Sequence, residues 1–192
     1  IMKRFSLLIA AMALFFAPAA QALPLLDMGL KVGMGQTVSY ADDEEIQEAL
    51  EDSEASILAL GVAMRIQVAV LQLEANALYW GESLDDGSYD ALSLPLLARF
   101  DFAPVPLLKF GVGAGLEFRF PIAADSAGED VSDAYQANTY LPLSVSLDIT
   151  IPGIDITTGV EGRYGYELGS AIKGRPDDRR TDYFLLMGTF LF

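Results

Sequence analysis

Residues 108–120 have the sequence LKFGVGAGLEFRF, in which every second position is apolar. Leucine, phenylalanine, valine and alanine occupy one parity, and lysine, glycine, glutamate and arginine occupy the other. Side chains of a β-strand point alternately to opposite faces, so this pattern predicts a strand with one apolar face and one small or charged face. The 13 residues also exceed the roughly 9–11 that a tilted strand needs to cross a bilayer.

The same alternation recurs along the chain, in segments separated by connections of two kinds. The other alternating segments are residues 28–38, 58–68, 71–79, 92–102, 141–149, 154–166 and 184–192. Short turns at 69–70, 103–106 and 150–153 alternate with long polar loops at 41–56, 81–90, 121–138 and 167–182. This arrangement predicts an all-β chain, an eight-stranded antiparallel up-and-down transmembrane β-barrel of the outer membrane. An even number of strands places both termini on the short-turn side, in the periplasm.

A lipocalin-like carrier also has eight strands, but its apolar residues point inward. Eight strands enclose a lumen only wide enough for their own side chains or for one small ligand. The leucines and phenylalanines of the apolar face exceed that volume, whereas the glycines, serines and isolated charges of the other face fit it. The apolar face is therefore expected to point outward into lipid.

Charged residues support this assignment, because none of the basic residues lies on the apolar parity. Six basic side chains are expected inside the barrel, and four lie in the last long loop (Lys31, Arg65, Arg99, Lys109, Arg119 and Arg163; Lys173, Arg175, Arg179 and Arg180). Six acidic side chains share the inward parity (Glu74, Asp101, Glu117, Asp148, Asp155 and Glu161). Buried charges need partners, so these twelve residues are predicted to close the lumen with an ionic network.

The N-terminal segment has the pattern of a secretory signal peptide. Lys3 and Arg4 precede the apolar stretch 5–17, and Ala20-Gln21-Ala22 is a small-x-small cleavage site. Residues 1–22 are therefore predicted to be cleaved, which leaves the barrel as residues 23–192. A membrane anchor is less favoured, because the stretch is shorter than the ~20 residues of a spanning helix. The chain without Lys3 and Arg4 has 10 basic and 27 acidic residues, a net charge of −17, which argues against nucleic-acid binding.

Aromatic residues and prolines give two further expectations. Most aromatic residues lie near strand ends on the outward parity, as in interface girdles. Packing of these rings inside the barrel is less favoured, because the narrow lumen has no space for them. The element Leu-Pro-Leu occurs at 94–96 and again at 141–143. Because proline cannot donate a ladder hydrogen bond, each is predicted to mark a β-bulge.

The mature chain resembles the family of small outer-membrane β-barrel proteins that includes the OmpA transmembrane domain, OmpX and the opacity-type proteins. The most specific match is the end of the chain, YFLLMGTFLF at 183–192. Its alternate positions resemble the signal that the barrel-assembly machinery reads (Phe184, Leu186, Gly188, Phe190 and Phe192). The resemblance implies that this machinery, outer-membrane lipids and lipopolysaccharide are partners, and that the protein resides in the outer membrane of a Gram-negative-type bacterium.

No catalytic constellation is recognisable. Outer-membrane enzymes of this size resemble one another in using a histidine base, and this sequence contains no histidine and no cysteine. We expect no enzymatic activity and no cofactor, since the inward carboxylates face basic partners. Loop four could contact lipopolysaccharide phosphates through its four basic residues.

The first long loop is strongly acidic. It contains eight acids and no base (Asp42, Asp43, Glu44, Glu45, Glu48, Glu51, Asp52 and Glu54). A solvated loop with a helical turn is the simpler interpretation, and a divalent-cation site is the alternative, since crowded carboxylates suit Ca²⁺ or Mg²⁺. Two functions remain open: a structural and surface-interaction barrel that presents these loops to an extracellular ligand, and a narrow porin-like channel for small solutes.

Overall fold

The computed structural model describes residues 26–41, 55–68, 71–84, 87–105, 107–154, 156–174 and 179–192. Its elements are β1 (Leu26–Ala41), β2 (Ser56–Val68), β3 (Leu71–Leu84), β4 (Gly87–Val105), β5 (Leu108–Ser126), β6 (Glu129–Asp130), the 3₁₀ helix η1 (Ser132–Ala134), β7 (Asn138–Ile151), β8 (Ile156–Gly169) and β9 (Arg179–Leu191). The predicted signal peptide, residues 1–22, lies outside the described residues. No helix in the described part of the chain is long and apolar enough to cross a membrane.

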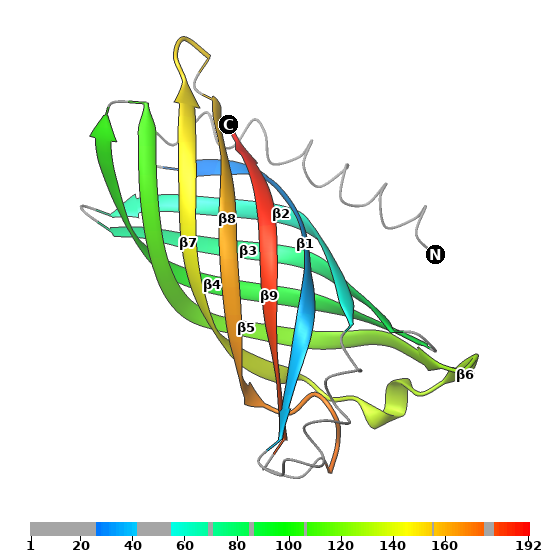
Figure 1. Ribbon diagram of the computed structural model, residues 1–192. Coiled ribbons are helices and arrows are strands. Elements are labelled where there is room, and N and C mark those ends of the chain that lie inside the picture. Colours follow the sequence, from blue (N-terminus) through cyan, green and yellow to red (C-terminus); the bar gives the residue numbers. More distant parts are fainter. Residues whose placement is uncertain are drawn as a thin grey trace.

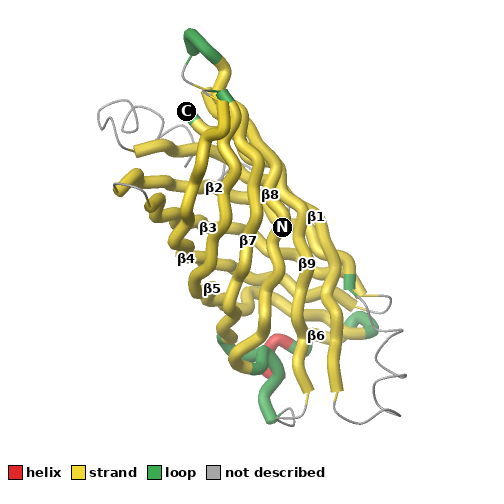
Figure 2. Tube along the Cα trace, turned by 60° about the vertical axis from the view of Figure 1, so that its left-hand side comes forward, coloured by secondary structure: helices red, strands yellow, loops and turns green. Residues whose placement is uncertain are grey.

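Eight long strands form a closed antiparallel barrel (Figure 1). Each strand pairs with its neighbours along the chain, and β9 returns to pair with β1 from Gly29↔Leu191 to Ala41↔Arg179. The two-residue strand β6 only extends the hairpin beyond β5, through Asp125↔Asp130 and Ser126↔Glu129. Figure 2 shows that almost all of the described chain is strand. The eight-stranded all-β prediction is thus confirmed.

The barrel has a turn end and a loop end. At the turn end β2 is followed by β3, β4 by β5 and β7 by β8, and Phe192 exchanges two backbone hydrogen bonds with Met28. At the loop end β1 is followed by β2, β3 by β4, β5 by β6, η1 and β7, and β8 by β9. In Figure 1 the C-terminus marks the turn end, and β6 marks the loop end.

The strands extend further at the loop end than the sequence predicts. The segment 81–90, predicted as a long loop, instead continues the β3–β4 ladder as far as Leu84↔Gly87. The segment is rich in polar residues and yet forms part of a strand whose inward positions, Tyr89 and Ala91, are buried. Part of each of the segments 121–138 and 167–182 is likewise strand, because β5 continues to Ser126 and β9 begins at Arg179.

Neither Leu-Pro-Leu element contains the predicted bulge. The β4–β5 register passes unshifted through Pro95↔Glu117, and the β7–β8 register passes unshifted through Pro142↔Gly165. On the side of the other neighbouring strand, the ladder is interrupted at each proline, but the register is the same before and after the gap. For Pro95 the gap lies between the pairs Ala75↔Leu96 and Leu78↔Ser93. The missing N–H therefore removes ladder bonds locally and inserts no extra residue.

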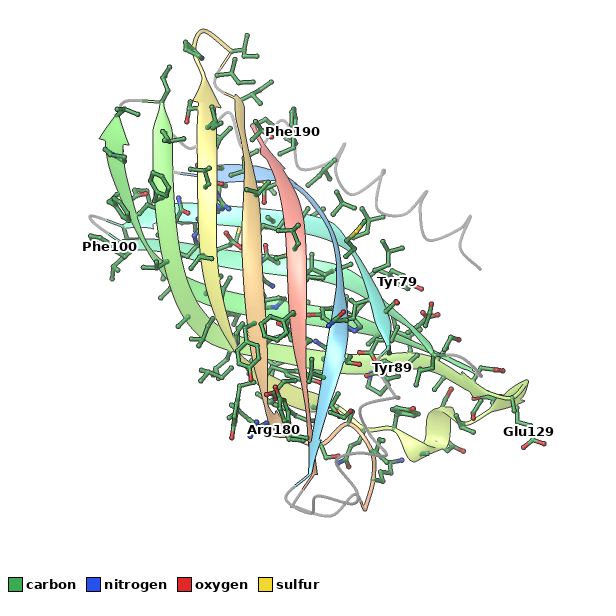
Figure 3. All side chains as sticks on the ribbon, in the orientation of Figure 1. Tyr79, Tyr89, Phe100, Glu129, Arg180 and Phe190 are labelled. Atoms are coloured by element: carbon green, nitrogen blue, oxygen red, sulfur yellow. The ribbon has the colours of Figure 1, made fainter. Side chains whose placement is uncertain are left out.

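The apolar parity points outward in every long strand. Along β2, for example, outward leucine and methionine side chains alternate with inward alanines that are almost completely buried. The most exposed apolar side chains, Met34, Val145 and Leu186, are 61–69% exposed. In Figure 3 the labelled Phe100 and Phe190 lie near the turn end, and Arg180 lies near the loop end. A continuous apolar outer surface of this kind is stable only in lipid.

Candidate functional site

Glu74 is the centre of an ionic cluster in the half of the lumen nearer the turn end. Its carboxylate accepts hydrogen bonds from Lys31 Nζ at 2.5 Å, Arg65 Nε at 2.6 Å and Arg99 Nη1 at 2.7 Å. Asn76 Nδ2 donates a further bond at 2.9 Å. The β2–β3 register brings this about in part, because Arg65 and Glu74 are directly opposite each other.

Two more carboxylates join the same basic residues from the other side of the barrel. Glu161 of β8 accepts from Lys31 at 2.5 Å and from Arg163 at 2.7 Å. Asp148 of β7 accepts from Arg65 at 2.8 Å and lies 3.3 Å from Arg99. We call this set the turn-end cluster, and each of its members is at most 2% exposed (Lys31, Arg65, Glu74, Arg99, Asp148, Glu161 and Arg163).

Glycines on β5 make the space that the turn-end cluster requires. A Cβ atom built on Gly113 would lie 2.8 Å from Arg99 Cγ, and one on Gly111 would lie 2.6 Å from Arg99 Nη2. Larger residues at these positions would displace the guanidinium that pairs with Glu74. The glycine-rich inward face of residues 108–120 therefore shapes the lumen.

Three other residues of the predicted network are not part of this cluster. Asp101 is partly exposed and reaches Arg99 only at 3.5 Å. Lys109 is half-buried and forms no ion pair with a described residue. Asp155 lies outside the described residues. The remaining pair, Glu117 and Arg119, belongs to a second cluster nearer the loop end.

Arg119 lies inside a set of aromatic rings in the loop-end half of the lumen. Its guanidinium carbon is 3.6 Å from the centre of the Trp80 ring, 4.2 Å from that of Tyr140 and 5.1 Å from that of Tyr183. Arg119 Nη2 donates to Glu117 at 2.7 Å, and Nη1 donates to Glu82 at 3.4 Å. We call this set the arginine cage (Trp80, Glu82, Glu117, Arg119, Tyr140 and Tyr183).

The acids of the arginine cage also hold the aromatic rings. Trp80 Nε1 donates to Glu82 at 2.7 Å, and the Tyr183 hydroxyl donates to Glu117. The rings of Trp80 and Tyr183 meet edge to face at 4.9 Å. Charge, hydrogen bonds and ring contacts thus act on the same six side chains, which fixes the position of Arg119.

The premise that the lumen has no space for aromatic rings is therefore wrong. Trp80, Tyr89, Tyr140 and Tyr183 are inward and at most 3% exposed. The room comes from small residues on neighbouring strands: a Cβ atom on Gly165 would collide with the Tyr183 ring. One sign of these inward rings was available in the sequence, their position on the inward parity of each strand. The glycine that makes room for Tyr183 lies opposite it in the β8–β9 register.

Loops three and four are joined to each other on the loop-end side of the arginine cage. Tyr135 and Ile172 form a β-bridge, Gln136 N donates to Ala171 O at 2.7 Å, and Lys173 Nζ donates to Asp133 O at 2.6 Å. Between these loops and the arginine cage lies a cavity of about 460 Å³, whose lining includes Glu82, Tyr89, Arg119, Tyr135 and Glu167.

A pair of tyrosines forms part of this cavity wall. The rings of Tyr89 and Tyr135 stack at 4.8 Å. Partial burial, with a smaller contribution from Glu82, raises the pKa of the Tyr135 phenol. The Tyr89 hydroxyl is buried and has no hydrogen-bond partner among the described residues.

The other predicted sites fall on β9 and in the loops. Phe184, Leu186 and Phe190 point outward and are 44–61% exposed, whereas Gly188 leaves a gap beside Val32. The eight acidic residues of loop one lie outside the described residues, as does Arg175 of loop four. Arg180, predicted to lie in loop four, is instead an outward residue of β9 opposite Tyr40. Within the described ranges no group of three or more acidic residues has the geometry of a metal site.

Several solved structures have the same barrel architecture as this chain. Neisserial surface protein A aligns with 86% of this chain and 97% of its own, at a TM-score of 0.55 and 13% identity. The fold is that of the small outer-membrane β-barrels. The barrel also resembles the outer-membrane enzyme PagL, which aligns over 84% of this chain and 97% of its own (TM-score 0.51, 14% identity). OprG from Pseudomonas aeruginosa aligns over 86% and 93% (TM-score 0.50, 12% identity).

These structural relatives indicate an outer-membrane location and leave the activity open. One of the three is an enzyme, so the fold does not separate enzymes from barrels without catalytic activity. No family model matches the sequence, and no curated protein matches it. The specific role must therefore be argued from this chain's own side chains.

Proposed function

We propose that this protein is a structural and surface-interaction barrel whose lumen is closed. The carrying observation is the burial of the turn-end cluster, because charged side chains that line a water-filled pore are exposed to that water. Lys31, Glu74 and Arg99 are at most 2% exposed, and the arginine cage follows them in series along the lumen. A closed barrel is a membrane support, so contact with other molecules falls to its loops, in envelope stability, adhesion or binding of an extracellular ligand.

Single-channel recording in planar bilayers tests this proposal. The refolded barrel should give no steady openings under conditions in which a general-diffusion porin conducts. Steady openings of the wild-type protein would contradict the closed lumen.

A narrow pore for small solutes is the second candidate, and one observation favours it. Several buried polar atoms of the turn-end cluster have no hydrogen-bond partner among the described residues, including Arg65 Nη2, Arg163 Nη1 and Asp148 Oδ1. Buried N–H groups need a partner, and internal water is a suitable one. Internal water would conduct only if it formed a continuous column through the lumen, so the bilayer recording separates the two candidates.

The proposed role requires the loop end to face the exterior and both termini to face the periplasm. Short turns on the periplasmic side and longer loops outside are the rule in bacterial outer-membrane barrels. An epitope inserted at residue 176 should be labelled by antibody on intact cells, and one inserted at residue 153 should not. The opposite labelling would reverse the orientation.

Three predicted properties remain part of this proposal. β9 is the segment that the barrel-assembly machinery would read, because its outward Phe190 and Leu186 stay accessible while its backbone closes the barrel on β1. The acidic loop 42–54 is the candidate for divalent cations, which calorimetry with Ca²⁺ on the intact barrel would test. The protein acts without catalysis, cofactor or nucleic acid.

A further inference from the structure

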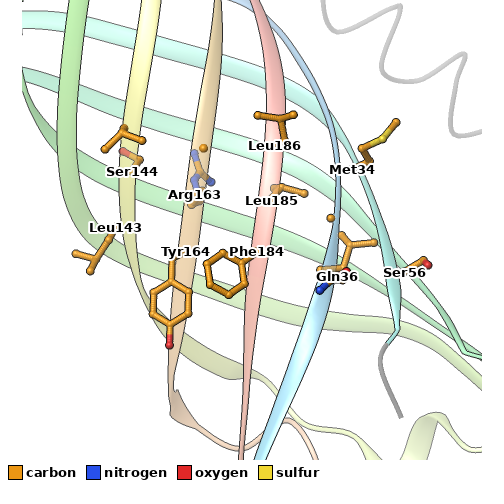
Figure 4. Close-up of a pocket in the computed structure, with 14 residues that line it drawn as sticks. Met34, Gln36, Ser56, Leu143, Ser144, Arg163, Tyr164, Phe184, Leu185 and Leu186 are labelled. Carbon is orange, nitrogen blue, oxygen red and sulfur yellow. The ribbon is translucent and has the colours of Figure 1, made fainter. Parts of the chain in front are cut away.

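The outer surface of the barrel has an apolar groove across β7, β8, β9 and β1 (Figure 4). Its volume is about 850 Å³, and its outward lining includes Met34, Val145, Gly162, Tyr164 and Leu186. Figure 4 shows Tyr164 and Phe184 side by side at one end of the groove, with Leu186 further along β9.

The groove exists because Gly162 has no side chain at an outward position. Its neighbours across the ladders are Val145 on β7 and Leu186 on β9. A Cβ atom at Gly162 would meet only Val145 Cγ2, at 3.7 Å, so the space is open. The side chains around it are the most exposed apolar residues of the barrel, Met34, Val145 and Leu186.

The outward side chains change in character from the groove toward the loop end. The Tyr164 and Phe184 rings come first, 4.9 Å apart. Two residues further along β9 is Asp182, and two further still is Arg180 opposite Tyr40. The apolar groove, the ring pair and the guanidinium therefore lie in the same order as the acyl chains, the interface and the headgroups of a lipid layer.

Arg180 is the one basic side chain on the outward face among those that the structure describes. Its guanidinium lies 4.8 Å from the centre of the Tyr40 ring and 4.4 Å from that of Tyr166. Nη1 donates to the Tyr166 hydroxyl at 3.1 Å, whereas Nη2 has no hydrogen-bond partner among the described residues. The side chain is thus held in place with one edge open.

Asp182 orients this arginine without covering its open edge. It lies 3.0 Å from Arg180 Nε and is completely buried, whereas the Arg180 side chain is 35% exposed. The Asp182 oxygens also accept from the Tyr164 hydroxyl and from Glu167 N. A molecule that approaches from the membrane therefore meets the positive group and not the negative one.

We propose that this surface binds one phosphorylated lipid of the outer leaflet, with an acyl chain in the groove at Gly162 and a phosphate on the open edge of Arg180. The occupant is a lipopolysaccharide-type lipid, because Arg180 lies on the loop side of the groove and complements an anionic headgroup there. A second barrel is a poorer occupant, since a symmetric contact would bring two Arg180 side chains together. The proposal rests on the orientation given above.

The chain contains its own control, a second apolar groove of about 470 Å³ on β2 to β5. Its outward lining includes Ala75, Leu96 and Ala114, and no described basic side chain lies on that part of the outer face. Ala114→Leu fills this groove just as Gly162→Leu fills the first. Both changes add apolar volume on the lipid-facing side, so they are matched in kind.

The test titrates refolded barrels in detergent with diphosphorylated lipid A and measures bound lipid by native mass spectrometry. Gly162→Leu and Arg180→Gln should each raise the Kd by about tenfold, the loss expected for one charge-assisted contact or one well-filled groove. Ala114→Leu should bind like the wild type. Before titration, each variant is shown to be folded by its faster migration when unheated.

Two lipids serve as comparison probes. Phosphatidylcholine should bind at least tenfold more weakly than lipid A, because its headgroup is zwitterionic. Equal binding of phosphatidylcholine, or equal Kd values for all variants, would overturn the lipid site, and equal binding of phosphatidylglycerol would overturn the outer-leaflet assignment. Conductance of the same preparations reports on the closed lumen separately, so either conclusion can fail alone.

Discussion

Replacing Glu74 with glutamine removes the central negative charge of the turn-end cluster and preserves the side chain's size. Three cations lie within 2.7 Å of this carboxylate. After the change they share Glu161 and Asp148, with Asp101 at 3.5 Å from Arg99. Removing one partner of a buried ion pair costs about 3–5 kcal/mol. Because three pairs are broken together at a site that is 2% exposed, we expect Glu74→Gln to lower the free energy of unfolding by about 5 kcal/mol.

Urea unfolding of the refolded barrel in lipid vesicles measures this loss. Trp80 is the only tryptophan of the sequence and lies in the arginine cage, so its fluorescence reports on the barrel as a whole. Asp101→Asn is the matched control, because that carboxylate is partly exposed and has one contact at 3.5 Å; its cost should be below about 1 kcal/mol. A Glu74→Gln variant within about 1 kcal/mol of the wild type would refute the assignment of a tightly paired lumen.

Two further predictions concern the packing of the lumen and the closing strand. Gly165→Val should lower the free energy of unfolding by at least about 3 kcal/mol, because the added carbons collide with the Tyr183 ring, whereas Gly169→Val, which meets no atom within 4 Å, should be near neutral; urea titration compares them. Phe192→Ala should reduce the folded barrel recovered from membranes of living cells and leave refolding into detergent unchanged, and equal losses in both assays would show that Phe192 serves stability and not assembly.

The sequence predicted the barrel because alternation is a local property. Lys31, Arg65 and Glu74 could be assigned to the inner face by counting residues along each strand. Their individual contacts could not be assigned, because these depend on register across the barrel: Lys31 reaches Glu161, which lies 130 positions away in the sequence. The parity of each residue along its strand therefore predicts which side chains line the lumen. Which of these side chains contact one another can be read only from the closed barrel.

The missed features have two physical causes. Trp80 and Tyr183 were missed because the sequence argument compared the volumes of whole faces, although a single glycine such as Gly165 provides local room for a ring. Arg180 and the segment 81–90 were assigned to loops because their residues are polar. A strand that continues past the hydrocarbon layer no longer needs an apolar outer face, so alternation of hydropathy fades before the strand ends.

The pairing of β1 with β9 also constrains the order of events in folding. The two strands are the first and last of the barrel, and until they meet each presents an unpaired edge, from Gly29 to Ala41 and from Arg179 to Leu191. The partners of Lys31 come from β3 and β8, so its charge remains unneutralised until distant parts of the chain have assembled. The barrel must therefore form late and cooperatively, and a chain held before that step would be prone to pair its edges with other molecules.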